Sequence, residues 1–132
     1  MMRFTSPSRK ETNYSSLIWH ESAAVGGVRY ATRRVSLQQR IELASKIREI
    51  VLRHEFLKAG DSGDQLEVTL GELLVRKLYI EWGLLEIKNL TIDGELATVE
   101  SIVAKGPEAL ADEIVTTIRG QLDLSEDERK NF

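Results

Sequence analysis

The strongest hydrophobic pattern in the chain begins after Ser36. Apolar side chains, together with one histidine, recur at spacings of three and four, which is the period of a helix with one buried face. Ser36 and Gln39 form a capping-box pattern at the start, and Gly60 supplies a stop. The sequence therefore predicts a helix over Leu37–Ala59. The recurring positions are Ile41, Ala44, Ile47, Val51 and His54, flanked by Leu43, Ile50 and Leu57.

A second helical pattern follows a short polar loop. Its apolar side chains lie four residues apart, at Leu66, Leu70, Leu74, Leu78 and Trp82. The first part also alternates like a strand, and Thr69 with Glu72 offers a later cap. We expect a helix over 65–82, ended by Gly83. Gly71 is unfavourable within a helix by about 1 kcal/mol relative to Ala, so it indicates a close backbone contact.

Before the first helix, residues 28–35 alternate with the period of a strand. Val28, Tyr30 and Thr32 share one face, while Arg29 and Arg33 lie on the other. We expect a half-buried strand whose charged face protects an exposed sheet edge. Residues 1–16 are polar and basic, with few large apolar groups, which predicts a flexible N-terminal arm.

The C-terminal half changes period twice. Residues 84–97 alternate around Asp93-Gly94, which predicts a small hairpin. Thr98 can cap a short helix over Val99–Lys105, and Pro107 suits the start of the next one. Ser125 begins another capping pattern, so residues 125–132 are expected to start a further helix or tail. The fold class is α+β, mainly α, with one globular domain over 17–124, an N-terminal strand and a hairpin between the central and C-terminal helices.

Charge is divided unevenly along the chain. Residues 1–58 contain eleven Lys and Arg against five Asp and Glu, a net charge of +6. Residues 59–132 contain seven against sixteen, a net charge of −9. Such a division is typical of a domain that contacts other macromolecules or packs one part against the other. The absence of cysteine is compatible with a reducing cytoplasm and excludes disulfides and thiolate metal sites.

The sequence contains few residues suited to catalysis. It has no glycine-rich phosphate loop, and both His20-Glu21 and His54-Glu55 lack the second His that a zinc-binding helix needs four residues later. We expect His54 to be a packed side chain with one backbone partner, and Glu108, Asp112 and Glu113 to form a solvated acidic face. No catalytic residue, metal or cofactor is predicted, and no apolar run reaches the length of a membrane span.

A stripe of basic residues is one possible binding surface. Its candidate residues are Arg29, Arg33, Arg34, Arg40 and Arg48. Phosphate binding requires such a stripe, but acidic residues interleave with it and aromatic residues are only 6% of the chain. A nucleic-acid-binding module is therefore the less favoured alternative.

Several segments have a familiar order and character. They are Gly27–Tyr30, Arg34–Ser36, Arg40–Leu43, Glu55–Gly60, Leu78–Leu84, Leu90–Glu95, Ala97–Thr98 and Leu124–Asn131. Together they resemble small phage or prophage proteins of the tail assembly chaperone type, encoded near tail genes, and the resemblance covers about residues 27–131. None of these segments is a catalytic signature.

The resemblance implies a non-enzymatic assembly factor in the cytoplasm of a bacterial host. Such proteins bind the long, largely helical tape-measure protein, and many are made in two lengths by frameshifting. Self-association is expected, and membrane binding is not. Aromatic and apolar side chains dominate protein interfaces, so the candidate partner contacts are Tyr79, Trp82, Leu84 and Leu85. The alternative within the same class is a small structural component of the virion tail or connector.

Overall fold

Over the residues that it describes, the computed structural model combines four helices with two small antiparallel sheets, which confirms the α+β, mainly α class. It describes residues 11–58 and 64–130, with side chains over 11–54 and 65–122. In chain order the elements are β1 (Leu17–Glu21), β2 (Arg29–Arg33), α1 (Leu37–Lys58), α2 (Asp64–Gly83), β3 (Leu84–Lys88), β4 (Thr91–Ile92), β5 (Glu95–Leu96), α3 (Val99–Lys105) and α4 (Glu108–Lys130).

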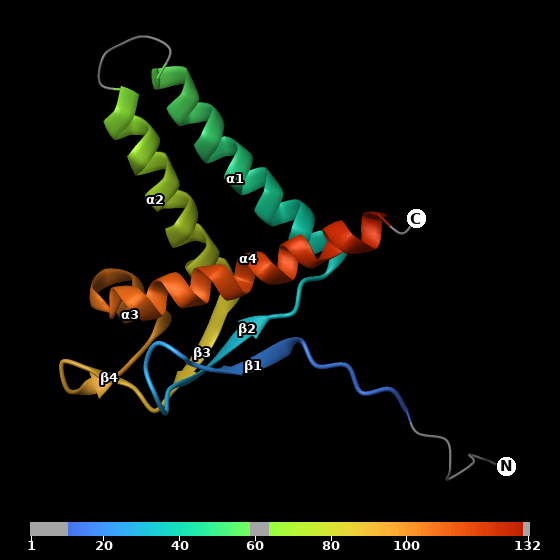
Figure 1. Cartoon of the computed structure of the whole chain (residues 1–132), viewed down its shortest axis with the longest axis vertical. Helices are drawn as coiled ribbons and strands as arrows, with labels where there is room; N and C mark the ends of the chain where they lie inside the picture. Colours follow the sequence, from blue (N-terminus) through green and yellow to red (C-terminus); the bar gives the residue numbers. More distant parts are fainter. Residues whose placement is uncertain (1–10, 59–63, 131–132) are drawn as a thin grey trace, which may run out of the picture.

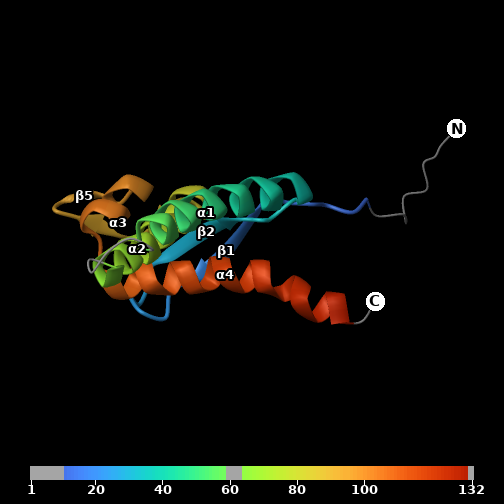
Figure 2. The ribbon, with the colours of Figure 1, turned by 90° about the horizontal axis from the view of Figure 1, so that it is seen from above.

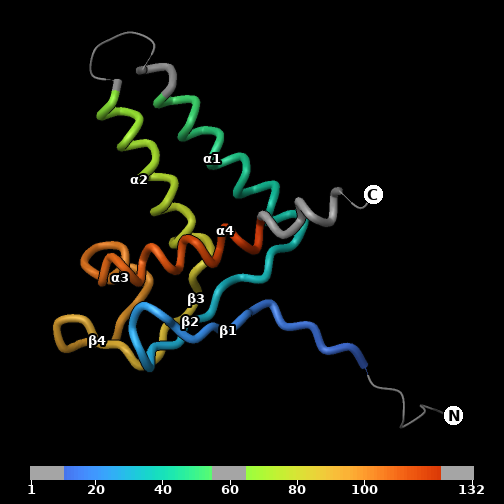
Figure 3. The backbone as a smooth tube through the Cα atoms, viewed as in Figure 1, coloured from blue at the N-terminus to red at the C-terminus, as the bar shows by residue number. Residues whose placement is uncertain are grey.

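Two long helices form a hairpin that rises from the rest of the molecule. Figure 1 shows α1 and α2 side by side, with α4 crossing near their base and the strands below it. Figure 3 follows the same antiparallel course of α1 and α2 along the backbone. The capping box at the start of α1 is formed as expected: Gln39 N–H donates to Ser36 Oγ at 3.2 Å, and Ser36 N–H donates to Gln39 Oε1 at 3.1 Å.

The main sheet has the order β1-β2-β3, so β2 lies in the middle. The prediction of a strand at 28–35 is confirmed in type, but its expected place at an exposed edge is wrong. The reason is that Leu17–Glu21 and Leu84–Lys88, which the sequence pattern did not assign to this sheet, pair with its two sides. Viewed from above in Figure 2, β1 and β2 lie between α4 and α1.

The core lies where α4 covers the sheet. The buried cluster joins strand residues Val28, Tyr30 and Leu84 to Ile80 of α2 and Ile102 of α3, together with the apolar stripe of α4. That stripe comprises Leu110, Ile114, Val115 and Ile118. Gly83 ends α2 at this contact, and a Cβ there would lie only 2.7 Å from Ile118 Cδ1. Glycine therefore lets α2 approach α4 closely.

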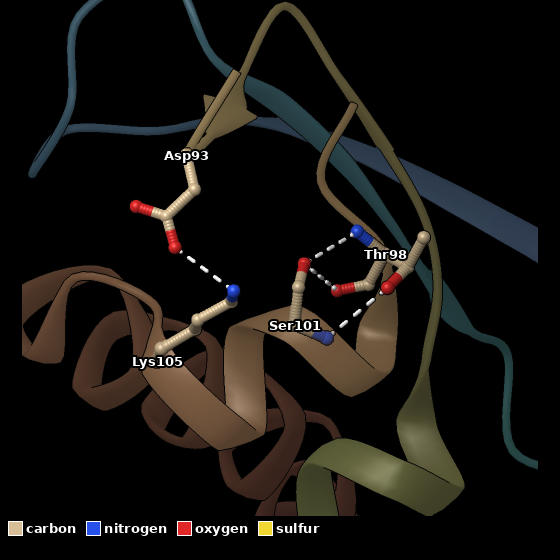
Figure 4. A network of polar contacts seen from close by, with 4 residues as sticks. All are labelled: Asp93, Thr98, Ser101 and Lys105. Carbon is tan, nitrogen blue, oxygen red and sulfur yellow. Dashed lines mark hydrogen bonds and ion pairs between the residues drawn. The ribbon is translucent and has the colours of Figure 1, made fainter. Parts of the chain in front are cut away.

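The predicted hairpin exists but is shorter than the pattern suggested. Only β4 and β5 pair with each other, around Asp93 and Gly94, which adopt φ angles of 53° and 84°. Residues 84–88 join β2 instead. Thr98 and Ser101 form the cap of α3, and Lys105 Nζ lies 2.8 Å from Asp93 Oδ2, as Figure 4 shows. The short helix and the turn are thus tied together.

The end of the chain differs from the expectation of a new helix at Ser125. The structure continues α4 without a break through Lys130. A capping-box pattern can occur inside a helix because the same residues are also compatible with helical backbone. At the other end, residues 1–10 of the predicted arm lie outside the described residues, and residues 11–16 form no helix or strand.

Candidate partner-binding site

The half of the α1–α2 hairpin nearest the connecting loop is held by a close contact between the two helices. His54 of α1 is only 7% exposed, and its Nδ1–H donates to Glu67 Oε2 of α2 at 3.0 Å. Gly71 of α2 lies against the imidazole, since a Cβ on Gly71 would be 3.2 Å from His54 Cγ. The close contact expected at Gly71 is confirmed, whereas the expected backbone partner of His54 is wrong: the partner is a side chain.

A groove of about 540 Å³ lies between α1 and α2 beside this contact. Its apolar lining comes from both helices and comprises Ile47, Val51, Val68, Val75 and Tyr79. The ring of His54 and the backbone of Gly71 complete the wall. The antiparallel pair thus offers an elongated, mainly apolar surface on one side of the hairpin.

Charged residues stand at the edge and base of the groove. Glu72 and Arg76 of α2 and Arg119 of α4 also line it. Arg76 forms an ion pair with Asp112 of α4, and the Arg119 guanidinium lies 5.9 Å from the centre of the Tyr79 ring. Among the described residues no carboxylate lies within ion-pair distance of Arg119. The groove can therefore combine apolar contacts with recognition of a negatively charged group.

The hairpin carries most of the exposed large hydrophobic side chains of the described residues. Ten large hydrophobic side chains are exposed in the described residues, and seven of them are on α1 and α2. They are Leu37, Ile41, Val51 and Leu52 of α1 and Leu66, Leu70 and Leu73 of α2. Single exposed apolar residues are ordinary, but a concentration on one protruding unit marks an interaction surface.

The four residues proposed from the sequence as partner contacts separate in the structure. Tyr79 lines the groove, and Trp82 is half-buried against the core with Arg33 over its ring. Leu84 is 1% exposed, because it faces α4, and it is unavailable to a partner. Leu85 is exposed because a register shift in β3 leaves it between the residues that pair with Thr32 and Ala31. We retain Tyr79 as the groove residue of this set.

Three of the five arginines proposed for the basic stripe form hydrogen bonds within the fold. Arg33 Nε donates to the Trp82 carbonyl, Arg34 Nε to the Ser15 carbonyl, and Arg40 Nη1 to the Leu122 carbonyl. These three arginines therefore connect separate parts of the fold. Arg48 is exposed on α1.

Arg29 differs from those three arginines. It lies with Lys88 over the ring of Trp19, at 5.1 and 4.7 Å from the ring centre. Trp19 belongs to β1, Arg29 to β2 and Lys88 to β3, so this contact links all three strands of the sheet.

A second polar cluster fixes α4 on the sheet. Glu113, Thr117 and Gln121 recur every four residues along one side of α4. Gln121 Nε2 donates to Thr32 Oγ1 at 2.9 Å, His20 Nε2 lies 2.8 Å from the same hydroxyl, and the Tyr30 hydroxyl lies 2.9 Å from Thr117 Oγ1. Burial lowers the pKa of His20, although the charge of Glu113 opposes this shift, and burial raises the pKa of Tyr30 to about 12.

Glu113 receives the loop between β1 and β2. Its Oε1 accepts from the backbone N–H groups of Ala23 and Ala24 at 2.9 and 2.7 Å, and from the Ser22 hydroxyl at 3.3 Å. Burial alone would raise the pKa of Glu113, but these hydrogen bonds together lower it. The expectation of a solvated acidic face is wrong for Glu113, which is half-buried and binds the β1–β2 loop. Glu108 and Asp112 are exposed, as expected, and Asp112 also pairs with Arg76. The four-residue spacing beside the apolar stripe was the available sequence signal for this cluster.

The described residues contain no group of three side chains placed to hold a metal ion. Within the same part of the chain, no helix has the length and apolar character needed to cross a membrane. No protein-family model matches the sequence, and neither the curated proteins nor the solved structures include a detectable match. The groove between α1 and α2, together with the apolar residues around it, is therefore the candidate functional site.

Proposed function

We propose that this protein is a non-enzymatic assembly factor of the tail assembly chaperone type, and that it holds a helical segment of its client in the α1–α2 groove. The observation that carries the proposal is the apolar groove on a protruding helical hairpin. The sequence resemblance supplies the expected client, the tape-measure protein. The proposal assigns the binding of the client to the groove and no covalent step to the protein.

The shape of the groove supports a helix as the occupant. An amphipathic helix presents apolar side chains at spacings of three and four, and these fit a hydrophobic groove between two other helices. The lining residues Val68, Val75 and Tyr79 lie on α2 within a span of twelve residues, whose ends are about 16 Å apart at the rise of an α-helix. Three turns of a client helix match that length.

The charges around the groove support a further property of the client. Arg119 stands at the base of the groove beside Tyr79. A client helix with an acidic residue at one end of its apolar stripe can pair with this guanidinium while the stripe covers the groove. Such a pair sets the direction of the helix more than it adds affinity, because an exposed ion pair contributes about 0–1 kcal/mol.

The experiment is co-expression of the chain with helical segments of the tape-measure protein from the same genome. We expect the wild-type chain to keep the segment in solution and to co-purify with it. Val51→Glu places a charge in the groove and is expected to abolish co-purification. Because Val51 is 40% exposed, the variant should remain folded.

The matched control is Leu96→Glu, which introduces the same charge at a residue that is 78% exposed on β5, outside the hairpin. It should co-purify like the wild type. Equal loss in both variants, or retention in both, would contradict the assignment of the groove as the client site.

The alternative function, a structural tail or connector component, makes a different prediction about location. An assembly factor should be present in infected-cell lysate and absent from purified particles, whereas a structural component should remain in the particles. Mass spectrometry of both fractions separates the two functions. The chain in stoichiometric amounts in particles would replace the proposed chaperone function with the structural one.

A further inference from the structure

The outer side of α2 carries an exposed apolar stripe. Leu66, Leu70 and Leu73 are 78%, 46% and 51% exposed. Their spacing of four and three residues places them within about 60° of one another around the helix. This is the pattern by which an amphipathic helix enters a hydrophobic groove.

The stripe lies on the side of α2 that faces away from the groove. At 100° per residue, Val68, Val75 and Tyr79 point about 165° away from Leu66, Leu70 and Leu73. The residues that line two separate hollows agree with this calculation. The groove is lined by Val68, Val75 and Tyr79, whereas a smaller hollow beside α3 is lined by Leu73 and Ile80. One chain therefore presents an apolar groove on one side of the hairpin and a helical apolar stripe on the other.

We propose that the protein self-associates head to tail, with the α2 stripe of one copy seated in the α1–α2 groove of the next. The two surfaces are different, so the contact is heterologous and each copy keeps one free groove and one free stripe at the ends of the assembly. Repetition of this contact produces a ring or a filament, depending on the rotation between copies.

Charge complementarity supports a second copy as the occupant. Lys77 follows the stripe on the same side of α2, and Glu81 lies one turn further along. The groove carries Glu72 and Arg119, which have the opposite signs. Among the described residues none of these four side chains has an ion-pair partner within 4 Å. Lys77 and Glu81 of one copy can therefore pair with Glu72 and Arg119 at the groove of the next.

The size of the contact indicates reversible association. A helix of 20 residues is about 30 Å long and about 10 Å wide, so each side contributes a footprint of roughly 300 Å². Stable complexes bury about 800 Å² per partner. We therefore expect an association that a client helix can displace from the same groove. The self-association itself requires no client, so the test below can fail independently of the proposed function.

The test measures molar mass in solution for the full chain without client, by light scattering or sedimentation at concentrations up to about 100 µM, where a micromolar contact is saturated. The wild type should show a mass that increases with concentration. The stripe variant Leu70→Glu/Leu73→Glu and the groove variant Val51→Glu should each be monomeric. The control Leu96→Glu should behave as the wild type does.

The decisive sample is an equimolar mixture of the stripe and groove variants. The stripe variant retains an intact groove, and the groove variant retains an intact stripe, so the mixture should form a dimer with one copy of each and nothing larger. A mixture that stays monomeric while the wild type associates would overturn the head-to-tail contact in favour of a symmetric one. A wild type that is monomeric at about 100 µM would overturn the self-association itself.

Circular dichroism of each variant establishes that a monomeric mass does not result from unfolding. If the double variant unfolds, Leu66→Glu serves as the stripe variant, because this side chain is 78% exposed. The same mixing experiment then decides the outcome.

Discussion

Gly71 of α2 lies directly against the imidazole of His54 of α1, where a Cβ would be 3.2 Å from His54 Cγ. This pair sets how closely the two helices approach, and the groove lies beside it. The hydrogen bond from His54 to Glu67 fixes the ring that Gly71 meets. The separation of α1 and α2, and with it the width of the groove, depends on residue 71 being a glycine, which has no side chain.

Gly71→Val should push the helices apart. The branched side chain overfills the contact, and overpacking of this kind costs about 1–3 kcal/mol, more than the gain in helix propensity. We expect the free energy of unfolding to fall by that amount in urea titration, with weaker co-purification of the client. Gly120→Ala is the control, since a Cβ there has nothing within 4 Å, and it should raise stability by up to about 1 kcal/mol. Unchanged stability in Gly71→Val would show that the contact is looser than described.

His54→Leu should leave the protein as stable as the wild type or more stable by about 1 kcal/mol. His54 Nε2 is buried without a hydrogen-bond partner among the described residues, and replacing such a group by an apolar side chain of similar size removes a desolvation cost. Glu67 is 36% exposed and can be hydrated once its partner is gone. Urea titration measures the change. A loss of more than about 2 kcal/mol would mean that the His54–Glu67 bond contributes more than this cost.

Glu113→Gln should destabilise the protein at neutral pH and much less in acid. Charge-assisted hydrogen bonds contribute about 1.5–3 kcal/mol, so the loss of the charged acceptor should lower the free energy of unfolding by about 1–2 kcal/mol. The pKa of Glu113 is lowered from 4.5 by folding, so the stabilisation is fully present above that value and is lost as the pH falls through the folded pKa.

The measurement for Glu113 is the difference in unfolding free energy between wild type and variant from pH 7 to pH 3. The difference should narrow below about pH 4.5. Asp93→Asn is a matched control, because Asp93 is an exposed carboxylate paired with Lys105 on the surface, and surface pairs contribute little. A difference for Glu113→Gln that is independent of pH would show that the charge of the carboxylate is not what holds the loop.

Trp82→Ala should destabilise the fold instead of only weakening partner binding. The sequence pattern suggested Trp82 as a partner contact, but the side chain packs against the core and lies under Arg33, 5.5 Å from the ring centre. Removing a large, partly buried aromatic side chain is expected to cost about 2–4 kcal/mol. Thermal unfolding gives the test, with Tyr79→Ala as the comparison in the groove. If Trp82→Ala had normal stability but did not bind the client, Trp82 would be a partner contact after all.

The sequence by itself determined the presence of the helices and the starts of α1 and α3. The capping pairs Ser36–Gln39 and Thr98–Ser101 and the Asp93-Gly94 turn depend on residues within four positions of one another, so their chemistry can be read directly from the chain. The need for glycine at residue 71 was also visible, because glycine inside a helix indicates a close approach. Tyr79 was proposed for a different reason, because aromatic side chains dominate protein interfaces.

Only the tertiary structure decided which apolar face is buried and which remains open. Leu84 and Leu85 are neighbours with the same side chain, yet a register shift against β2 buries the first and exposes the second. Glu113 appears as one of several surface acids until the β1–β2 loop brings two backbone N–H groups to it. Strand pairing and helix packing join residues far apart in the chain, and their free energy depends on partners that no local pattern contains. The groove and the stripe on opposite sides of α2 arise in this way, since the position of α1 determines which side of an apolar helix is covered.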